Sequence, residues 1–237
     1  MTPEPCTVRW ASPVAPEDAP GLVALLDEHE RDRLARFRRA ADRARYLAAH
    51  ALARVVLAEL IDVAPAGVEF DRTCRCGEQH GKPVVQAGCP LDAVPGFSLT
   101  HAGDVVGVAV WRDGPIGLDT EHVRSMTDLA GMIRHVASPA ETPHTGPATP
   151  DAFFTAWTRK EALLKATGTG LAAPMAAITL EGPRVVAWSG ERAPAAPMWL
   201  RDLRPAPGYT GAVAGAGPVA PPVAELRGDH LLRAAAR

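Results

Sequence analysis

The sequence lacks the features of a membrane or secreted protein. No apolar run approaches the roughly 20 residues that a membrane-spanning helix needs, since charged residues and a histidine interrupt even the richest stretch, 48–61. The N-terminus has glutamate and proline where a secretory signal would have a basic segment and then an apolar one. We therefore expect a cytoplasmic protein that does not contact a membrane.

An excess of charge of either sign is also missing. The 25 basic and 27 acidic residues leave a formal net charge of -2, which argues against a strongly basic nucleic-acid-binding protein. With 47% hydrophobic and 22% charged residues, the composition is that of an ordinary globular protein. A chain of 237 residues can bury a sizeable core without disulfides, and we expect its thiols to be reduced.

Cysteine is scarce, but three of the four cysteines lie near one histidine: Cys74, Cys76, His80 and Cys89. One interpretation is a structural zinc site. A single residue separates Cys74 from Cys76, whereas zinc-binding pairs usually have about two to four, so the chelate would be poor. The other interpretation is small thiols packed in a loop or at a strand edge.

Hydrophobic periodicity predicts helices followed by strands, twice along the chain. The first helical region runs from about 21 to 60, and strand-like runs follow up to Trp111. In the second half, a strand at 115–123 precedes helices at 128–137 and 151–167 and further strand-like runs. The tail after Pro218 looks loosely ordered. We expect an α/β (α+β) protein of two similar subdomains, 1–112 and 113–237, with a ligand cleft between them.

Asp119 and Glu121 are the first candidate site residues. They are two positions apart in a predicted strand, so both side chains leave the same face. Two carboxylates on one face repel each other unless a proton or a cation lies between them, and Mg²⁺ prefers such oxygen ligands. The alternative is a solvated pair at the surface.

The predicted helix at 151–167 carries the second set of candidates. Glu161 and Lys165 are four residues apart, and as an exposed pair they would contribute only about 0.3–0.5 kcal/mol. Trp157 shares their face and should be buried, which would bring these charges inward, where each needs a partner. Glu161 could then share a cation with the strand carboxylates, and Lys160 and Lys165 could meet phosphate.

Basic residues in the first half offer a third set. Seven arginines lie between Arg31 and Arg45. They could form a solvated helix face, a nucleic-acid-binding patch or a discrete anion site. Lys82 follows a glycine before a predicted strand, and His101 ends another. These residues could form one phosphate pocket, although a histidine in that position is often structural.

Seven motifs occur in the order and spacing of one known family. They are RDRLARFRRAADRARYLAAHALAR (31–54), HGKP (80–83), SLTHAGD (98–104), GLDTE (117–121), WTRKEALLK (157–165), GTGL (168–171) and WLRDLRPAPGYTGAVA (199–214). Each motif alone is weak, but together they resemble the Sfp-type 4′-phosphopantetheinyl transferases over about residues 30–215.

The resemblance implies an activity and an architecture. Such an enzyme transfers 4′-phosphopantetheine from coenzyme A to a serine of an apo acyl, peptidyl or aryl carrier protein and releases 3′,5′-ADP. The reaction depends on Mg²⁺, or on Mn²⁺ in its place. The two subdomains would be related by a pseudo-two-fold axis in a monomer, the first binding the coenzyme A nucleotide and the second, with a flexible C-terminal tail, holding the metal. Polyketide or nonribosomal peptide synthesis would supply the carrier proteins.

The resemblance also implies residue roles. Asp119, Glu121 and Glu161 would bind the metal, and Glu161 would also take the serine proton. Lys165, with Lys160 beside it, would contact the coenzyme A diphosphate. The residues that match nucleotide-binding positions are Arg45, Lys82, Thr100 and His101. The chain departs from the family pattern at Thr100, where serine is common, and at Glu30, where a basic residue is common; Glu141 matches an acidic position.

Two other functions remain as alternatives. One is a non-catalytic module that binds coenzyme A or a carrier protein, although such a module would not need all four of Asp119, Glu121, Glu161 and Lys165. The other is a nucleic-acid-binding protein that uses the Arg31–Arg45 run, for which binding should weaken steeply with salt.

Overall fold

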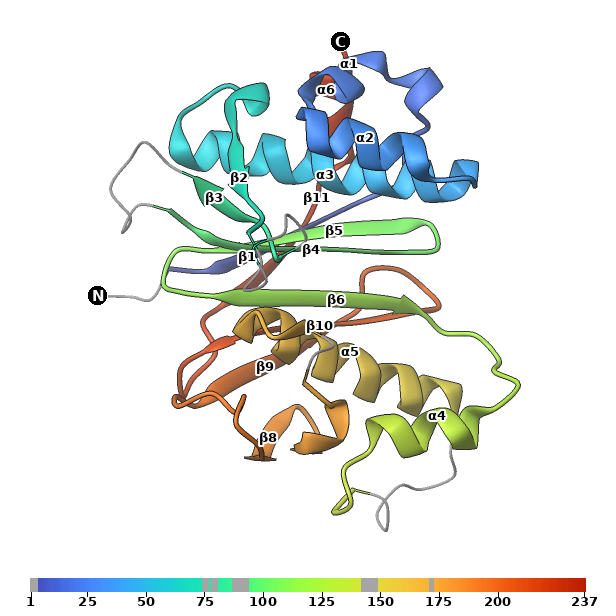
Figure 1. The fold of residues 1–237 in the computed structure, drawn as a ribbon, viewed down its shortest axis with the longest axis vertical. Coiled ribbons are helices and arrows are strands. Elements are labelled where there is room, and N and C mark those ends of the chain that lie inside the picture. Colours follow the sequence, from blue (N-terminus) through green and yellow to red (C-terminus); the bar gives the residue numbers. More distant parts are fainter. Residues whose placement is uncertain (1–3, 74–76, 78–80, 87–93, 142–148, 171–172) are drawn as a thin grey trace. The chain divides into compact units, whose positions relative to one another are not determined.

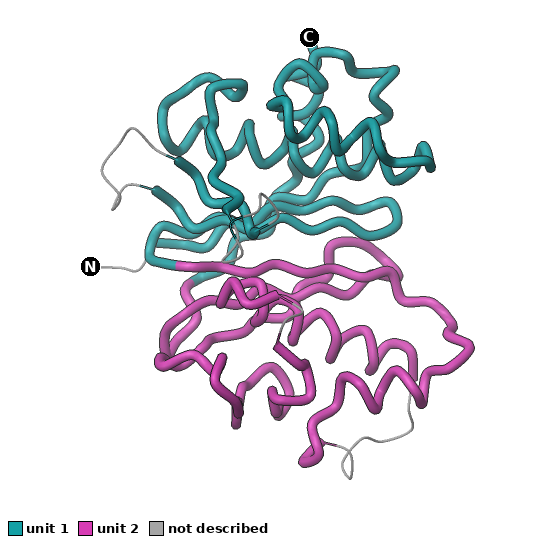
Figure 2. Tube along the Cα trace, in the orientation of Figure 1, with its two compact units in different colours: residues 1–114, 222–237 teal, residues 115–221 magenta. Residues whose placement is uncertain are grey.

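A computed structural model describes residues 4–73, 77, 81–86, 94–141, 149–170 and 173–237. The chain divides into two compact units (Figure 2). Unit 1 comprises Met1–Gly114 and Pro222–Arg237, and unit 2 comprises Pro115–Pro221. Unit 2 is thus a continuous segment, whereas unit 1 is formed by two segments of the chain. The C-terminal tail differs from expectation, because it is folded and belongs to unit 1.

A four-stranded sheet forms the base of unit 1. Its order is β11 (Val223–Arg227), β1 (Cys6–Ala11), β5 (Val105–Trp111) and β4 (Gly96–Ala102). β5 is antiparallel to both of its neighbours, whereas β11 pairs with β1 in parallel. The tail therefore supplies an edge strand to the first strand of the chain.

Helix α3 (Ala40–Ile61) packs on this sheet and forms the centre of the unit 1 core (Figure 1). Its residues from Tyr46 to Ala58 are almost all buried, except half-buried His50. The shorter helices α1 (Pro20–Leu25), α2 (Glu28–Arg36) and α6 (Asp229–Ala235) contact α3. A small hairpin of β2 (Glu69–Asp71) and β3 (Val84–Gln86) completes the described part of unit 1, together with 3-10 turns at Pro16–Asp18 and Pro65–Gly67.

Unit 2 combines a three-stranded antiparallel sheet with helix α5 (Pro150–Thr167). The sheet order is β6 (Ile116–His122), β10 (Tyr209–Ala216) and β9 (Met198–Leu203). α5 packs against β6 and β10, and helix α4 (Leu129–Val136) packs against α5. A 3-10 turn at Met175–Ala177 leads into the hairpin of β7 (Ile178–Glu181) and β8 (Arg184–Trp188).

Local sequence signals explain where α5 begins and ends. The Thr149 hydroxyl accepts a hydrogen bond from the Ala152 amide and Pro150 occupies the first turn, both common at helix starts. Gly168 ends the helix with φ 70°, a left-handed conformation that glycine adopts without strain.

The expected α/β (α+β) class is confirmed, and the two units share a plan in which one long helix packs on a mainly antiparallel sheet. Among the residues that the structure describes, no helix is both long enough and apolar enough to cross a membrane.

Candidate active site

Strand β6 and helix α5 approach each other unusually closely in unit 2. A Cβ atom on Gly117 would lie only 1.9 Å from the carbonyl oxygen of Ala162 and 2.4 Å from the amide nitrogen of Ala166. The glycine at the start of the GLDTE motif therefore lets the helix backbone rest on the strand. This contact brings the carboxylates of β6 next to those of α5.

The close approach joins Lys165 to Asp119. The Lys165 Nζ donates to Asp119 Oδ1 at 2.8 Å and to the carbonyl oxygen of Leu118 at 2.9 Å. Asp119 is buried and Glu161, one helical turn before Lys165, is only 9% exposed. The structure thus confirms that these charges lie inside unit 2 rather than in open solvent.

The three carboxylates also affect one another's ionisation. Burial raises the pKa of Glu161, repulsion from Asp119 and then from Glu121 raises it further, and the Lys165 charge opposes this rise. The pKa of Glu121 is raised by burial first and by Asp119 second, against the effect of Arg124 and Lys165. Three acids thus lie close together in a partly buried region beside Lys165, which pairs with Asp119, and a cation there would relieve their repulsion.

Asp119, Glu121 and Glu161 offer carboxylate oxygens as ligands for a metal ion. In the described ranges, no three His, Cys, Asp or Glu side chains already form a ready ligand cage. The donor chemistry fits Mg²⁺, because this ion takes oxygen ligands, usually needs only one or two protein carboxylates and keeps several waters. Asp119, Glu121 and Glu161 are therefore suitable residues to hold a hard divalent cation.

Lys160 lies elsewhere, which corrects the expectation that it accompanies Lys165. Its Nζ is fully buried and donates to the Val136 carbonyl oxygen at 2.7 Å and to Glu141 Oε2 at 2.6 Å. Successive helix residues point about 100° apart, so Lys160 faces the end of α4 while Glu161 faces β6. Burial lowers the pKa of Lys160 and the Glu141 charge opposes this. The geometry supports a structural role for Lys160, not contact with a cofactor.

In unit 1, the structure brings Arg45 close to the end of β4. Arg45 donates from one guanidinium nitrogen to Asp42 and from another to the carbonyl oxygen of Gly103 at 3.0 Å, just after β4. His101 pairs with Val106, whose side chain belongs to the core on the α3 side of the sheet, so His101 shares the face that Arg45 covers. Thr100 is buried on the opposite face.

The remaining predictions of unit 1 are only partly within the described residues. Lys82 is half-buried in the segment that enters β3, after Gly81, whose amide donates to the Arg72 carbonyl oxygen at 2.7 Å. Cys74, Cys76, His80 and Cys89 lie outside the described residues, so the zinc interpretation stays untested. Cys6 is buried, and desolvation raises the pKa of its thiol to about 12.

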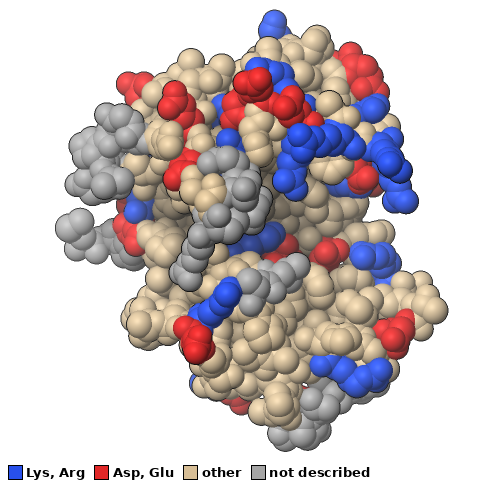
Figure 3. Space-filling model, viewed as in Figure 1, with Lys and Arg blue, Asp and Glu red and all other residues tan. Residues whose placement is uncertain are grey.

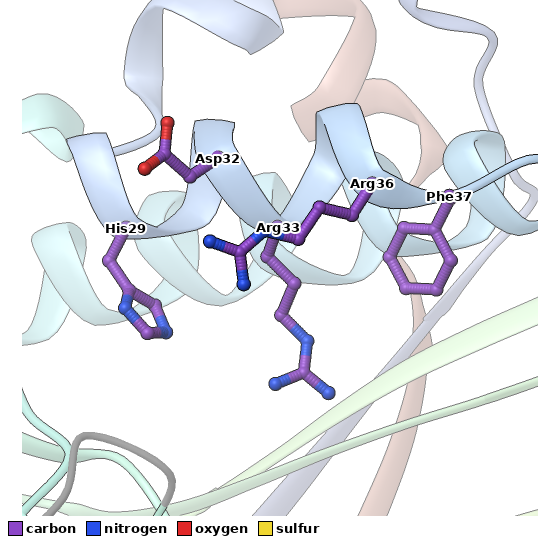
Figure 4. A pocket seen from close by; sticks show the side chains of 5 residues that line it. All are labelled: His29, Asp32, Arg33, Arg36 and Phe37. Atoms are coloured by element: carbon purple, nitrogen blue, oxygen red, sulfur yellow. The ribbon is translucent and has the colours of Figure 1, made fainter.

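A pocket on α2 was missed by the sequence reasoning. It has a volume of about 300 Å³ and is lined by His29, Asp32, Arg33, Arg36 and Phe37. In Figure 4 the side chains of His29, Arg33 and Phe37 project from the same side of the helix. Lys and Arg side chains gather over α2 and the start of α3 (Figure 3). Positions 29, 32, 33 and 36 are separated by three or four residues and therefore share one helix face. This spacing could have identified the pocket residues from the sequence.

Comparison with known proteins covers both units. Residues 10–112 match the model of the 4′-phosphopantetheinyl transferase N-terminal domain, and residues 115–201 match that of the 4′-phosphopantetheinyl transferase superfamily. The 4′-phosphopantetheinyl transferase HetI of Nostoc sp. is 32% identical over 204 residues, which are 83% of this chain and 81% of HetI.

Two further relatives agree. A phosphopantetheinyl transferase of Thraustochytrium sp. is 32% identical over 189 residues, 71% of this chain and 63% of its own. The 4′-phosphopantetheinyl transferase ffp of Bacillus subtilis is 25% identical over 214 residues, 87% of this chain and 89% of its own. The chain therefore belongs, as its motifs predicted, to the 4′-phosphopantetheinyl transferase superfamily and is an enzyme of that class.

Proposed function

We propose that this enzyme transfers 4′-phosphopantetheine from coenzyme A to a serine hydroxyl of an apo acyl, peptidyl or aryl carrier protein and releases 3′,5′-ADP. The observation that carries the proposal is the group of three carboxylates around Lys165 in unit 2. The resemblance extends the proposal to a Mg²⁺-dependent monomer that acts in the cytoplasm, with carrier proteins of polyketide or nonribosomal peptide synthesis.

The reaction forms one bond and breaks one. The serine oxygen bonds to the phosphorus that carries pantetheine, the bond from that phosphorus to the bridging oxygen breaks, and 3′,5′-ADP leaves with the electron pair. The serine proton must go to a base. A bound divalent cation supplies positive charge against the charge that develops on the phosphoryl oxygens.

We assign to Glu161 the role of the general base that accepts the serine proton. A glutamate with an ordinary pKa is a weak base at neutral pH, and a general base works best when its pKa is closer to the operating pH. Burial and the neighbouring carboxylates move the pKa of Glu161 in that direction. Lys165 contributes a positive charge held beside Asp119, suited to the diphosphate.

Unit 1 is the proposed binding place of the coenzyme A nucleotide. Arg45 and His101 lie on the same face at the end of β4, and Lys82 is a third candidate. The α2 pocket adds two guanidinium groups beside an aromatic ring. Arginine donates to phosphate through several N–H groups at once, and a ring offers a surface for a planar base.

One experiment tests the proposal and its alternatives. The full chain is mixed with coenzyme A, Mg²⁺ and an apo carrier protein, the carrier is analysed by mass spectrometry, and 3′,5′-ADP is measured by chromatography. We expect a phosphopantetheine adduct and one equivalent of 3′,5′-ADP. A carrier with its serine changed to alanine and a reaction with EDTA serve as controls. Coenzyme A binding without any adduct on acyl, peptidyl or aryl carriers would favour a non-catalytic module.

A further inference from the structure

Helix α2 carries the pocket but buries little of its own apolar surface. Of its nine residues, Glu30 and Leu34 alone are buried. Surface helices are usually held in place by a continuous apolar stripe. Leu34 alone buries little apolar surface for a helix that carries His29, Arg33 and Arg36 in the pocket. The position of α2 must therefore depend on other contacts.

The Glu30 carboxylate supplies such contacts. It is fully buried, and its Oε1 lies 2.8 Å from His50 Nδ1 and 3.0 Å from a guanidinium nitrogen of Arg72. Its Oε2 accepts from Arg54 Nε at 2.7 Å and from the Asp27 amide at 3.1 Å, which closes a capping box at the helix start. Four donors thus surround the two oxygens of Glu30.

Arg54 extends these contacts to the rest of unit 1. It is fully buried on α3 and donates to Asp27 Oδ2 at 2.8 Å and to the carbonyl oxygen of Val68, just before β2, at 2.7 Å. Arg54 and Arg72 each lie 5.1 Å from the centre of the Phe70 ring. The start of α2 is therefore tied to α3 and to the β2 segment through ionic contacts.

The charge of Glu30 is consistent with this network. Burial alone would raise its pKa, but the hydrogen bond and charge of His50, the charge of Arg54 and the Asp27 amide outweigh burial and hold the pKa at about 2. Removing the carboxylate would leave the guanidinium groups of Arg54 and Arg72 paired with Asp27 but without Glu30, and the loss of one partner from such a buried ionic network is unfavourable.

The same network reaches the pocket by a second route. The His50 ring stacks on Tyr46 with ring centres 4.0 Å apart, and Tyr46 packs on Phe37 at 5.3 Å. Phe37 lines the pocket. Glu30 itself lies between His29 and Arg33 in sequence but faces inward, so its partners fix both the helix and the aromatic wall.

We propose that Glu30 is a positioning residue for the α2 pocket, and that its buried contacts hold Arg33 and Arg36 where they meet the phosphates of the coenzyme A nucleotide. The inference rests on the nucleotide-binding role proposed above for this pocket. Glu30 does not touch the substrate, so its loss should weaken coenzyme A binding and leave the chemical step unchanged.

Glu30→Gln and Glu28→Gln form a matched pair of variants. Each removes one negative charge from the same helix, but Glu28 is exposed. We expect Glu30→Gln to raise KM for coenzyme A about tenfold, within the range for one lost charge-assisted contact, with kcat within about twofold. Glu28→Gln should change neither. An effect of charge alone would lower KM for coenzyme A in Glu30→Gln, because removing a negative charge near the phosphates would strengthen their binding.

Hydrogen exchange gives a second readout, independent of activity. Amides of α2 should exchange faster in Glu30→Gln than in the wild type, and should be unchanged in Glu28→Gln. If Glu30→Gln fails to fold, Arg72→Gln replaces it, because Arg72 lies at the edge of the network and its loss removes one contact from Glu30 and one from Asp27. The same direction of change is expected, about threefold in KM.

Arg36→Gln separates this inference from the proposed function. If Arg36→Gln raises KM for coenzyme A but the network variants change neither KM nor exchange, the positioning role is refuted and the nucleotide pocket stands. If transfer proceeds and neither Arg33→Gln nor Arg36→Gln changes KM, the pocket is not the nucleotide site and the inference falls with it. A fall in kcat alone in Glu30→Gln would also overturn it.

Discussion

Lys160→Met tests whether Lys160 serves the fold of unit 2 or the binding of coenzyme A. The lysine is fully buried, and its Nζ donates to the Val136 carbonyl oxygen at 2.7 Å and to Glu141 at 2.6 Å. Glu141 also accepts from the amides of Ser138 and Leu180. Methionine fills a similar volume but leaves this carboxylate without its cationic partner.

The expected cost follows from burial. Removing one member of a buried ion pair typically destabilises a protein by about 3–5 kcal/mol. Arg159→Met is the matched control, because Arg159 precedes Lys160 on α5 and also makes two short contacts, to Asp202, but near solvent. Exposed pairs contribute up to about 1 kcal/mol. Lys160→Met should therefore lose several times more stability than Arg159→Met, although both lose one positive charge.

Urea unfolding measures the stability lost by each variant, and hydrogen exchange of the α5 amides gives a second measure of it. The rate of transfer at increasing coenzyme A concentration, at a temperature where both variants are folded, gives KM for coenzyme A. We expect KM for coenzyme A to stay within about twofold in folded Lys160→Met, which is under 0.5 kcal/mol. Adding Glu141→Gln should recover part of the stability, because the unpaired charge is then removed. Unchanged stability together with a large rise in KM would refute the structural role and restore Lys160 to the substrate site.

Four further outcomes are expected. Asp119→Ala should abolish Mg²⁺-dependent transfer with an unchanged circular dichroism spectrum, and near-normal transfer would remove Asp119 from the site. Glu161→Gln should keep a low maximal rate at saturating Mg²⁺ and coenzyme A, with partial recovery at higher pH; a normal maximal rate would leave Glu161 as a metal ligand only. His101→Ala and Arg45→Ala should each weaken coenzyme A about ten- to a hundredfold but dephospho-coenzyme A much less, and equal losses would exclude contact with the 3′-phosphate. Because folding lowers the pKa of Glu30 from 4.5 to about 2, its contribution of about 3 kcal/mol is present above pH 4.5 and is lost as pH falls toward 2. Acid titration of unfolding free energy should show this loss in the wild type and not in Glu30→Gln.

The carboxylates of unit 2 could be predicted from sequence because their arrangement follows local rules. Alternation along a strand places Asp119 and Glu121 on one face, and a step of four places Glu161 and Lys165 on one side of a helix. Strand alternation and helical spacing do not predict how close the strand lies to the helix. The structure supplies it at Gly117, where the missing side chain lets the two backbones meet.

The C-terminal tail could not be predicted in the same way. Residues 223–227 form a parallel pair with β1, so Cys6 aligns with Val223 across nearly the whole chain. Such a pairing leaves no local signal, and from the sequence the tail looked loosely ordered. The Trp10 indole donating to Glu225 at 2.8 Å is one of the contacts that hold the tail in place.

Glu30 was noticed in the sequence only as a departure from a family pattern. Its partners explain the departure, because Arg54 and Arg72 come from positions 24 and 42 residues away and meet its carboxylate inside unit 1. The family pattern indicated a position where a basic residue is common, whereas the structure shows a fully buried carboxylate paired with Arg54 and Arg72. A pattern of residue types can locate a functional segment without showing which side chains reach the ligand.

Helix α5 shows the same point within three consecutive residues. Arg159 pairs with Asp202 on β9, and Lys160 pairs with Glu141 after α4. The pKa of Glu161 is raised by repulsion from the carboxylates of β6. Each step turns the side chain by about 100°, so a single motif faces three neighbours. Two of these contacts fix the rotation of the helix about its axis, and that rotation directs Glu161 toward Asp119. All three residues therefore serve the proposed site, although Glu161 is the one among them that takes part in the proposed chemistry.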